Sequence, residues 1–232
     1  MKKTPNKQYN VAKPGSFPVR IAVKQRRRMF SIFVEKCEVN DNDAVLDVGV
    51  TSDQTYESSN YVEAWLSNKN RITAAGIDDA VFLEKKYPGL TFVKANGLDL
   101  PFGDKSFDVV HSSAVLEHVG SFENQVQLIA ECARVTRKSF FLTTPNRYFP
   151  VEFHTLLPLV HWLPKPWFRC LMRATGRDFF ALESNLNLMS IFDIKKSAEL
   201  ALSLNDFSFD ILTVKIFGFN SNIILYGTRL KR

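Results

Sequence analysis

The chain has 232 residues, of which 45% are hydrophobic and 23% are charged, and its formal net charge is +6. These values exclude a disordered or fibrous chain, and the length favours one large domain over two independent ones. The sequence has no run of about 18 consecutive apolar residues and no apolar segment near its N-terminus. We therefore expect a cytoplasmic protein without a transmembrane segment.

The first predicted element is a helix over about residues 21–37, because apolar residues such as Met29 and Phe33 recur there at helical spacing. Residues 1–20 hold prolines among polar residues and are expected to form an N-terminal arm, which leaves 21–232 as a single domain. The basic residues 24–28 suit nucleic acid or an anionic membrane, but the exposed face of this helix is the better explanation.

Short apolar segments then alternate with helical ones. Strands are predicted over residues 44–48, 71–77, 90–93, 107–111 and 139–143, and helices over 61–66, over 81–86 and after Ser121. This alternation indicates a parallel sheet with helices on both faces, and right-handed crossovers place the carboxyl ends of its strands along one edge. Ligands bind at that edge in such folds.

The alternation stops at about residues 145–189, a segment rich in proline and aromatic residues that we interpret as an insertion or lid. A helix capped by Ser190 and strands over 209–217 and 222–228 follow, and Gly218 favours an antiparallel pair. The predicted fold is α/β and Rossmann-like, a mostly parallel seven-stranded sheet with an antiparallel C-terminal strand pair and helices on both faces.

Polar or glycine residues follow four predicted strands. We propose as cofactor-binding residues Asp47, Gly49, Thr51, Asp78, Asn96, Gly97 and Ser112. A carboxylate such as Asp78 can accept hydrogen bonds from both hydroxyls of a ribose, and Asn96 with the next backbone N–H can bind the edge of adenine. The first loop lacks the Gly-x-Gly-x-x-Gly pattern of dinucleotide folds, which argues against a pyrophosphate at this site.

These segments resemble the class I S-adenosylmethionine-dependent methyltransferases, specifically the methyltransferase type 11 group. The resemblance covers about residues 40–145 and rests on residues 44–53, 76–78, 96–110 and 115–119. It implies the methyltransferase fold, S-adenosylmethionine as cofactor and S-adenosylhomocysteine as product. Residues 143–150 are similar to members found among bacterial surface-polysaccharide genes, which implies a role in polysaccharide biosynthesis.

The chain departs from the family pattern at three positions. Thr51 and Asp53 replace the second and third glycines of the first motif, and Asn96 replaces the usual aspartate. A side chain at the first two positions narrows the methionine pocket unless the loop swings outward. Asn96 can still accept a hydrogen bond from the adenine amine through its carbonyl.

Methyl transfer to a hydroxyl requires an aligned acceptor and a base, for which histidine is suited near neutral pH. His154 in the insertion is our first candidate for the base or acceptor ligand, and His118 beyond the fourth strand is the second. His111 and His161 stand in apolar surroundings and are interpreted as packed residues.

The cysteines give no sign of a metal site. Cys37, Cys132 and Cys170 stand far apart, without the paired spacing of zinc ligands, and they are expected to be reduced. We therefore predict no metal.

The favoured function is O-methylation of a small molecule or saccharide. A nucleic-acid methyltransferase is less favoured, because residues 112–115 lack the Asn/Asp-Pro-Pro-aromatic segment that base methylation uses in that family. A non-catalytic protein that keeps the fold is a further alternative. The aromatic insertion has three possible roles: its rings can stack on a sugar, form a homodimer contact, or make peripheral contact with a membrane surface.

Overall fold

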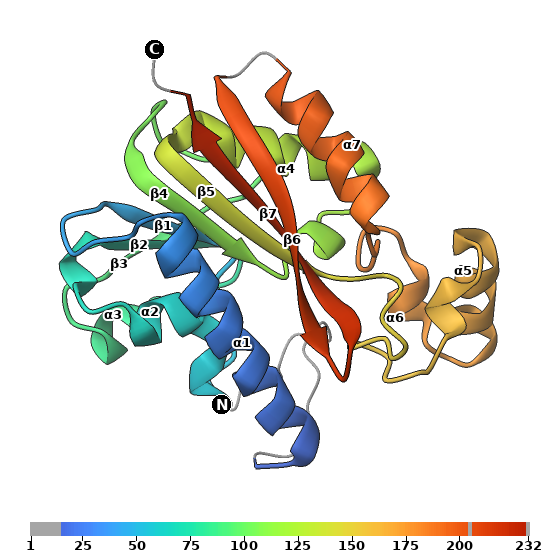
Figure 1. The fold of residues 1–232 in the computed structure, drawn as a ribbon. Helices are drawn as coiled ribbons and strands as arrows, with labels where there is room; N and C mark the ends of the chain where they lie inside the picture. Colours follow the sequence, from blue (N-terminus) through green and yellow to red (C-terminus); the bar gives the residue numbers. More distant parts are fainter. Residues whose placement is uncertain (1–14, 204–205, 231–232) are drawn as a thin grey trace.

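A seven-stranded sheet with the strand order β3-β2-β1-β4-β5-β7-β6 organises the protein (Figure 1). The structure is a computed structural model that describes residues 15–203 and 206–230. The strands are β1 (Val45–Val48), β2 (Ile72–Gly76), β3 (Thr91–Lys94), β4 (Phe107–Ser113), β5 (Thr136–Pro145), β6 (Phe207–Ile216) and β7 (Phe219–Arg229). Strands β1 to β5 are parallel, whereas β7 runs antiparallel to both β5 and β6. The predicted α/β fold is confirmed.

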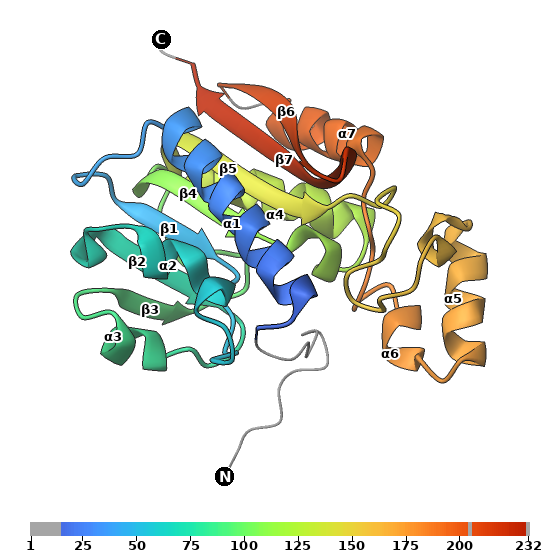
Figure 2. The same ribbon diagram turned by 60° about the horizontal axis from the view of Figure 1, so that its bottom comes forward.

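Helices cover both faces of this sheet (Figures 1 and 2). They are α1 (Phe17–Lys36), α2 (Tyr61–Trp65), α3 (Phe82–Lys86), α4 (Phe122–Val135), α5 (Lys165–Ala174), α6 (Asp178–Ala181) and α7 (Ile191–Leu202), with short 3-10 turns η1 (Glu57–Asn60), η2 (Lys69–Arg71), η3 (Leu116–His118) and η4 (Val160–Trp162). Helices α1, α2 and α3 pack on one face, and α4 and α7 pack on the other.

The alternation of side chains along β1 decides which residues meet which helices. Leu46 and Val48 join the apolar cluster under α4 and α7, whereas Val45 packs with Phe33 of α1. Asp47, two residues beyond Val45, therefore faces the α1 and α2 layer. A polar residue at the carboxyl end of β1 is thus buried between the sheet and two helices.

Two helices begin at the predicted caps. Ser121 accepts a hydrogen bond from the backbone of Asn124 at the start of α4, and Ser190 forms a reciprocal capping box with Asp193 at the start of α7. Helix α1, however, begins at Phe17 rather than near residue 21, because Pro18 fits the first turn of a helix. The first 14 residues of the expected arm lie outside the described residues.

The β6–β7 connection is shorter than predicted. Phe217 and Gly218 have φ angles of 49° and 86°, as a two-residue type I′ turn requires. Residues 220–222, which were expected in the connection, belong to strand β7 instead. The hairpin is antiparallel as predicted.

The segment 145–189 leaves and re-enters the domain at neighbouring points. Asn146 pairs with Met189 in a parallel bridge, and the Arg147 N–H donates to the Met189 carbonyl at 3.0 Å. Between these points α5 and α6 pack on each other around Phe168 and Met172, and Figure 2 shows them beside the sheet. Among the described residues, no helix is long and apolar enough to cross a membrane.

The pairing of β5 with β7, in which Phe140 lies opposite Gly227, gives a stability prediction. A Cβ atom added at Gly227 would lie 2.4 Å from the ring of fully buried Phe140. Gly227→Ala is expected to lower the free energy of unfolding by about 1–3 kcal/mol through overpacking. Gly103→Ala is the control, because the nearest atom to its added Cβ is Ser106 Oγ at 3.5 Å. Urea denaturation of both variants measures this, and equal stability would contradict the packing described.

Candidate functional site

The parallel register brings the four predicted strand ends to one edge of the sheet. Val48 of β1 pairs with Ala75 of β2 and with Ser112 of β4, and Gly76 pairs with Lys94 of β3. The loops that follow these strands are therefore neighbours. Gly49, Asp78 and Asn96 begin or lie in these loops, so the structure brings the predicted cofactor-binding residues to a common edge.

Gly49 occupies a position that only glycine fits. Its φ angle is 94°, and its N–H donates to the Ala75 carbonyl at 2.7 Å. An added Cβ would lie 2.1 Å from Val115 Cγ2. The backbone thus turns closely past the end of β4, and Val115 links this loop to the segment just beyond that strand.

The loop after Gly49 accommodates Thr51 by local hydrogen bonds. Thr51 Oγ1 accepts from the Asp53 N–H at 3.0 Å, so the hydroxyl is held within the loop. The Thr51 N–H donates to Asn60 Oδ1 at 2.9 Å, and Asn60 Nδ2 donates back to the Thr51 carbonyl at 3.0 Å. Asn60 fixes the loop against η1. Sequence reasoning missed Asn60 because this contact depends on how the chain returns after the turn.

Asp47 belongs to a buried polar network rather than to an open surface. Its Oδ1 lies 2.7 Å from His111 Nδ1, and His111 Nε2 lies 2.8 Å from the Tyr61 hydroxyl. Glu63 of α2 is 0% exposed and its carboxyl lies beside that of Asp47. Neither Tyr61 nor Glu63 was predicted as a site residue, since only packing of α2 on the sheet brings them to β1.

The charges of this network are set by burial. Burial raises the pKa of Asp47 to about 7 and lowers the pKa of His111 to about 3. Burial and the nearby Asp47 charge raise the pKa of Glu63 well above its ordinary value. His111 is therefore neutral, donating from Nδ1 to Asp47 and accepting at Nε2 from Tyr61. The expected packed role of His111 agrees with this arrangement.

Three other predicted residues differ in exposure. Ser112 is buried and its Oγ donates to the Val48 carbonyl at 2.8 Å, which ties β4 to β1. Asn96 is exposed, and its Oδ1 accepts from the Leu98 N–H at 3.0 Å, within the turn after β3. Asp78 is half-buried at the end of β2.

His118 and His154 come together although 36 positions separate them. Their Nε2 atoms lie 3.1 Å apart, His118 Nδ1 lies 2.7 Å from the Asn185 carbonyl, and His154 Nδ1 lies 2.6 Å from Glu152 Oε1. Glu117 is 0% exposed, and its Oε2 accepts from the Thr144 hydroxyl at 2.9 Å. The cluster joins η3, the end of β5 and the insertion.

The pKa values in this cluster move in opposite directions. Burial lowers the pKa of His118. Burial also opposes the charge on His154, but the hydrogen bond and charge of Glu152 outweigh it and raise the pKa of His154. His161, the remaining histidine of the insertion, is buried with Nε2 2.7 Å from the Phe149 carbonyl and lies outside the cluster. Glu117 and Glu152 were not predicted as a pair of acids near these histidines.

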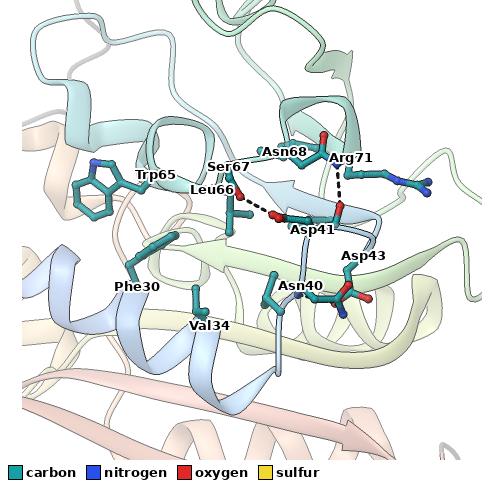
Figure 3. A pocket seen from close by; sticks show the side chains of 13 residues that line it. Phe30, Val34, Asn40, Asp41, Asp43, Trp65, Leu66, Ser67, Asn68 and Arg71 are labelled. Atoms are coloured by element: carbon teal, nitrogen blue, oxygen red, sulfur yellow. Dashed lines mark hydrogen bonds between the residues drawn. The ribbon is translucent and has the colours of Figure 1, made fainter.

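A cavity of about 210 Å³ lies elsewhere, near the amino ends of β1 and β2 (Figure 3). Phe30, Trp65 and Leu66 form its apolar wall, and the Asp41 carboxylate accepts from the Ser67 hydroxyl at its polar side. Val45 and Ile72, which line it, are the first residues of their strands. This cavity is therefore at the edge opposite to the predicted cofactor site.

Comparisons with known proteins point to one family. Residues 46–142 match the family model described as a methyltransferase domain. A probable S-adenosylmethionine-dependent methyltransferase of Mycobacterium tuberculosis is 40% identical over 67 residues, which are 28% of this chain and 23% of that protein. A similar protein of Mycolicibacterium smegmatis is 35% identical over 81 residues, 33% of this chain and 30% of its own. The matched segments span less than a third of these relatives.

Solved structures share the fold. Magnesium protoporphyrin IX methyltransferase from Synechocystis, solved with bound S-adenosylmethionine, has a TM-score of 0.55 and 15% identity, covering 96% of this chain and 88% of its own. A [4+2]-cyclase has a TM-score of 0.57 and 13% identity, covering 88% and 80%. At this identity the likeness concerns the fold alone.

The family match lies on the segment that contains β1 to β4, α4 and most of β5, together with the glycine turn and the polar strand ends between them. Residues 46–142 are thus similar to a methyltransferase domain, and the sheet has the Rossmann-like fold that solved class I methyltransferases share.

Proposed function

We propose that the protein is an S-adenosylmethionine-dependent methyltransferase that methylates an oxygen atom of a small molecule or saccharide. The family match over residues 46–142 carries this proposal, because it coincides with the edge where Gly49, Asp78 and Asn96 lie together. When bound, the cofactor supplies an electrophilic methyl group that an acceptor oxygen attacks in line. The protein must then align the acceptor and exclude water.

The loop after β1 fits such a cofactor. The Gly49 backbone turns without a side chain, and the Thr51 hydroxyl is bound within its own loop. Gly49, Thr51 and Gly97 would offer backbone groups, while Asp78 would accept from the ribose and Asn96 would bind adenine. Asp47 and Ser112 would support the cofactor site indirectly. Their buried hydrogen bonds to His111 and to the Val48 carbonyl hold the ends of β1 and β4 in place.

His154 and His118 would serve the acceptor. Glu152 orients the ring of His154 through Nδ1, and the Asn185 carbonyl orients His118 in the same way. Val115, which packs on Gly49, is two residues from Glu117 and three from His118 in the sequence, which supports a place for the histidine pair near the cofactor loop. We propose His154 as the base or acceptor ligand and His118 as the second candidate for this role, as the sequence suggested.

A non-catalytic protein is the second candidate. Thr51 and Asp53 stand where the family has glycines, and the 210 Å³ cavity lies at the opposite edge of the sheet. Nucleic acid is less favoured as a partner, because the arginines of the basic cluster contact their own chain. Arg26 donates to Ser58, Arg27 lies 3.8 Å from the Trp65 ring and Arg28 donates to the Lys215 carbonyl.

The insertion supports peripheral contact with an anionic membrane surface. Trp167 is 70% exposed and Trp162 is 43% exposed, and Leu156 and Leu159 are exposed nearby in the chain. Arg173 on the same helix as Trp167 is also exposed. Exposed tryptophans beside basic side chains suit the headgroup region of a bilayer. The alternative is a homodimer that forms through this face, and a measurement of the molar mass in solution would reveal it.

Cofactor binding is tested by calorimetry with S-adenosylhomocysteine. Asp78→Ala is expected to weaken binding by roughly 10-fold or more, because hydrogen bonds to a charged group contribute about 1.5–3 kcal/mol. Asp210→Ala on β6 makes the same charge change at an exposed position and should leave affinity unchanged. No binding to the native chain at millimolar ligand would favour the non-catalytic candidate.

The acceptor role is tested by transfer of labelled methyl groups into fractionated cell metabolites and glycans. His154→Ala should lower the transfer rate by about 100-fold or more, since general-base catalysis contributes about that factor. Its affinity for S-adenosylhomocysteine should not change. Leu182→Ala, also in the insertion and 50% exposed, is the control. Unchanged transfer by His154→Ala would reject the role of His154.

Membrane contact is tested by flotation with vesicles that contain phosphatidylglycerol. The double variant Trp162→Ala/Trp167→Ala should lose most of the floated fraction, because it removes the exposed aromatic anchors. Leu200→Ala removes an exposed apolar side chain from α7 and should float as the native chain does. Equal flotation of neutral and anionic vesicles, or none, would contradict the proposed surface.

A further inference from the structure

Three ligand atoms converge where the insertion meets the end of β4. One ligand atom from each of Glu117, His118 and His154 lies within 4.8 Å of the other two, and the two histidines approach through their Nε2 atoms. Glu117 and His118 belong to η3, whereas His154 comes from the insertion. Two imidazole nitrogens and one carboxylate oxygen are a common protein ligand set for divalent transition metals.

The hydrogen bonds use the Nδ1 atom of each ring and leave both Nε2 atoms directed at the centre of the cluster. The Asn185 carbonyl can only accept, so His118 Nδ1 carries the proton. Glu152 Oε1 also accepts from the His154 backbone N–H at 2.9 Å, and Glu152 Oε2 accepts from the Thr155 N–H. The Glu152 carboxylate is thus an acceptor for His154 Nδ1. With a proton on each Nδ1 atom, the two Nε2 atoms face each other 3.1 Å apart, where one cation can bind to both.

Glu117 provides an independent sign of a missing partner. Its side chain is 0% exposed, and among the described residues Oε1 has no hydrogen-bond partner. This oxygen lies 3.9 Å from His118 Nε2, so it is directed into the cluster. Leaving a buried carboxylate oxygen unpaired costs free energy, which a bound cation would offset.

We propose that Glu117, His118 and His154 bind one divalent transition-metal ion, with Zn²⁺ as the reference ion. Two nitrogens that bind the same zinc ion at about 2.0–2.1 Å with tetrahedral angles lie about 3.4 Å apart, close to the separation here. Glu152 and the Asn185 carbonyl hold the two rings from behind, as outer partners do in metal sites. This site departs from the expectation of no metal, which rested on cysteine spacing.

The proposed ion would tie the insertion to the sheet. The side chains of His118 and His154 are 15% and 11% exposed, so the two histidines keep a small contact with solvent, whereas Glu117 is fully buried. Three protein ligands leave a coordination position for a further oxygen ligand, as catalytic zinc sites do. That an acceptor hydroxyl occupies this position rests on the proposed function, whereas binding of the ion does not.

Zinc binding to the untagged full chain, measured by calorimetry without cofactor or acceptor, tests the site. We expect one ion per chain, with Mg²⁺ bound at least about 100-fold more weakly because nitrogen ligands do not suit it. His118→Gln, His154→Gln and Glu117→Gln should each weaken zinc binding by about 100-fold, and Glu152→Gln by about 10–100-fold as an outer partner. Cys170→Ser, which removes an exposed thiol, should bind zinc as the native chain does.

The unfolding temperature and the affinity for S-adenosylhomocysteine distinguish loss of the metal site from loss of the fold or of the cofactor site. Zinc should raise the unfolding temperature of the native chain and of Cys170→Ser, but not that of His154→Gln, because only a folded site binds the ion. Affinity for S-adenosylhomocysteine should stay unchanged in all these variants, so failure of the metal site and failure of the proposed function give different results. Equal zinc affinity of the native chain and the two histidine variants would overturn the proposal.

Discussion

The parallel pairing of β1 with β4 is the constraint on which the rest of the structure depends. It places Asp47 directly beside His111 and Val48 beside Ser112, with one pair on each face of the sheet. The Asp47–His111 contact is buried under α1 and α2, and the Ser112 hydroxyl is bonded to the Val48 carbonyl. Because these two contacts fix the carboxyl ends of β1 and β4 relative to each other, the loops that follow the two strands start from fixed positions.

Those two loops contact each other. Val115, beyond β4, packs on Gly49, beyond β1, and the chain then turns through η3 to present Glu117 and His118. The insertion returns to this place with His154, while its ends are held together by the bridge between Asn146 and Met189. The loop after β1, the turn η3 and the insertion are thus neighbours through short packing links.

The unusual first loop shows how a motif can change while its backbone turn is kept. Glycine is needed at Gly49, where the φ angle is 94° and Val115 leaves no room for a side chain. At Thr51 a side chain is accommodated, because its hydroxyl bonds to the Asp53 N–H and Asn60 bonds to its backbone. Glycine is therefore present where a side chain would clash, and the hydrogen bonds of Asn60 in η1 hold the backbone of the next residues of the loop.

The sequence by itself determined the order and type of the seven strands and of helices α1 to α4 and α7, the capped starts of α4 and α7, and the segment that carries the family match, but not helices α5 and α6 of the insertion. Each of these depends on residues within a few positions of one another, where hydrophobic period and capping chemistry act. Tertiary structure alone decided the partners of the site. His111 meets Asp47 across 64 positions and His118 meets His154 across 36. Such contacts, and the burial that shifts the pKa of Asp47, arise only when strands, helices and insertion pack together, so no local pattern could specify them.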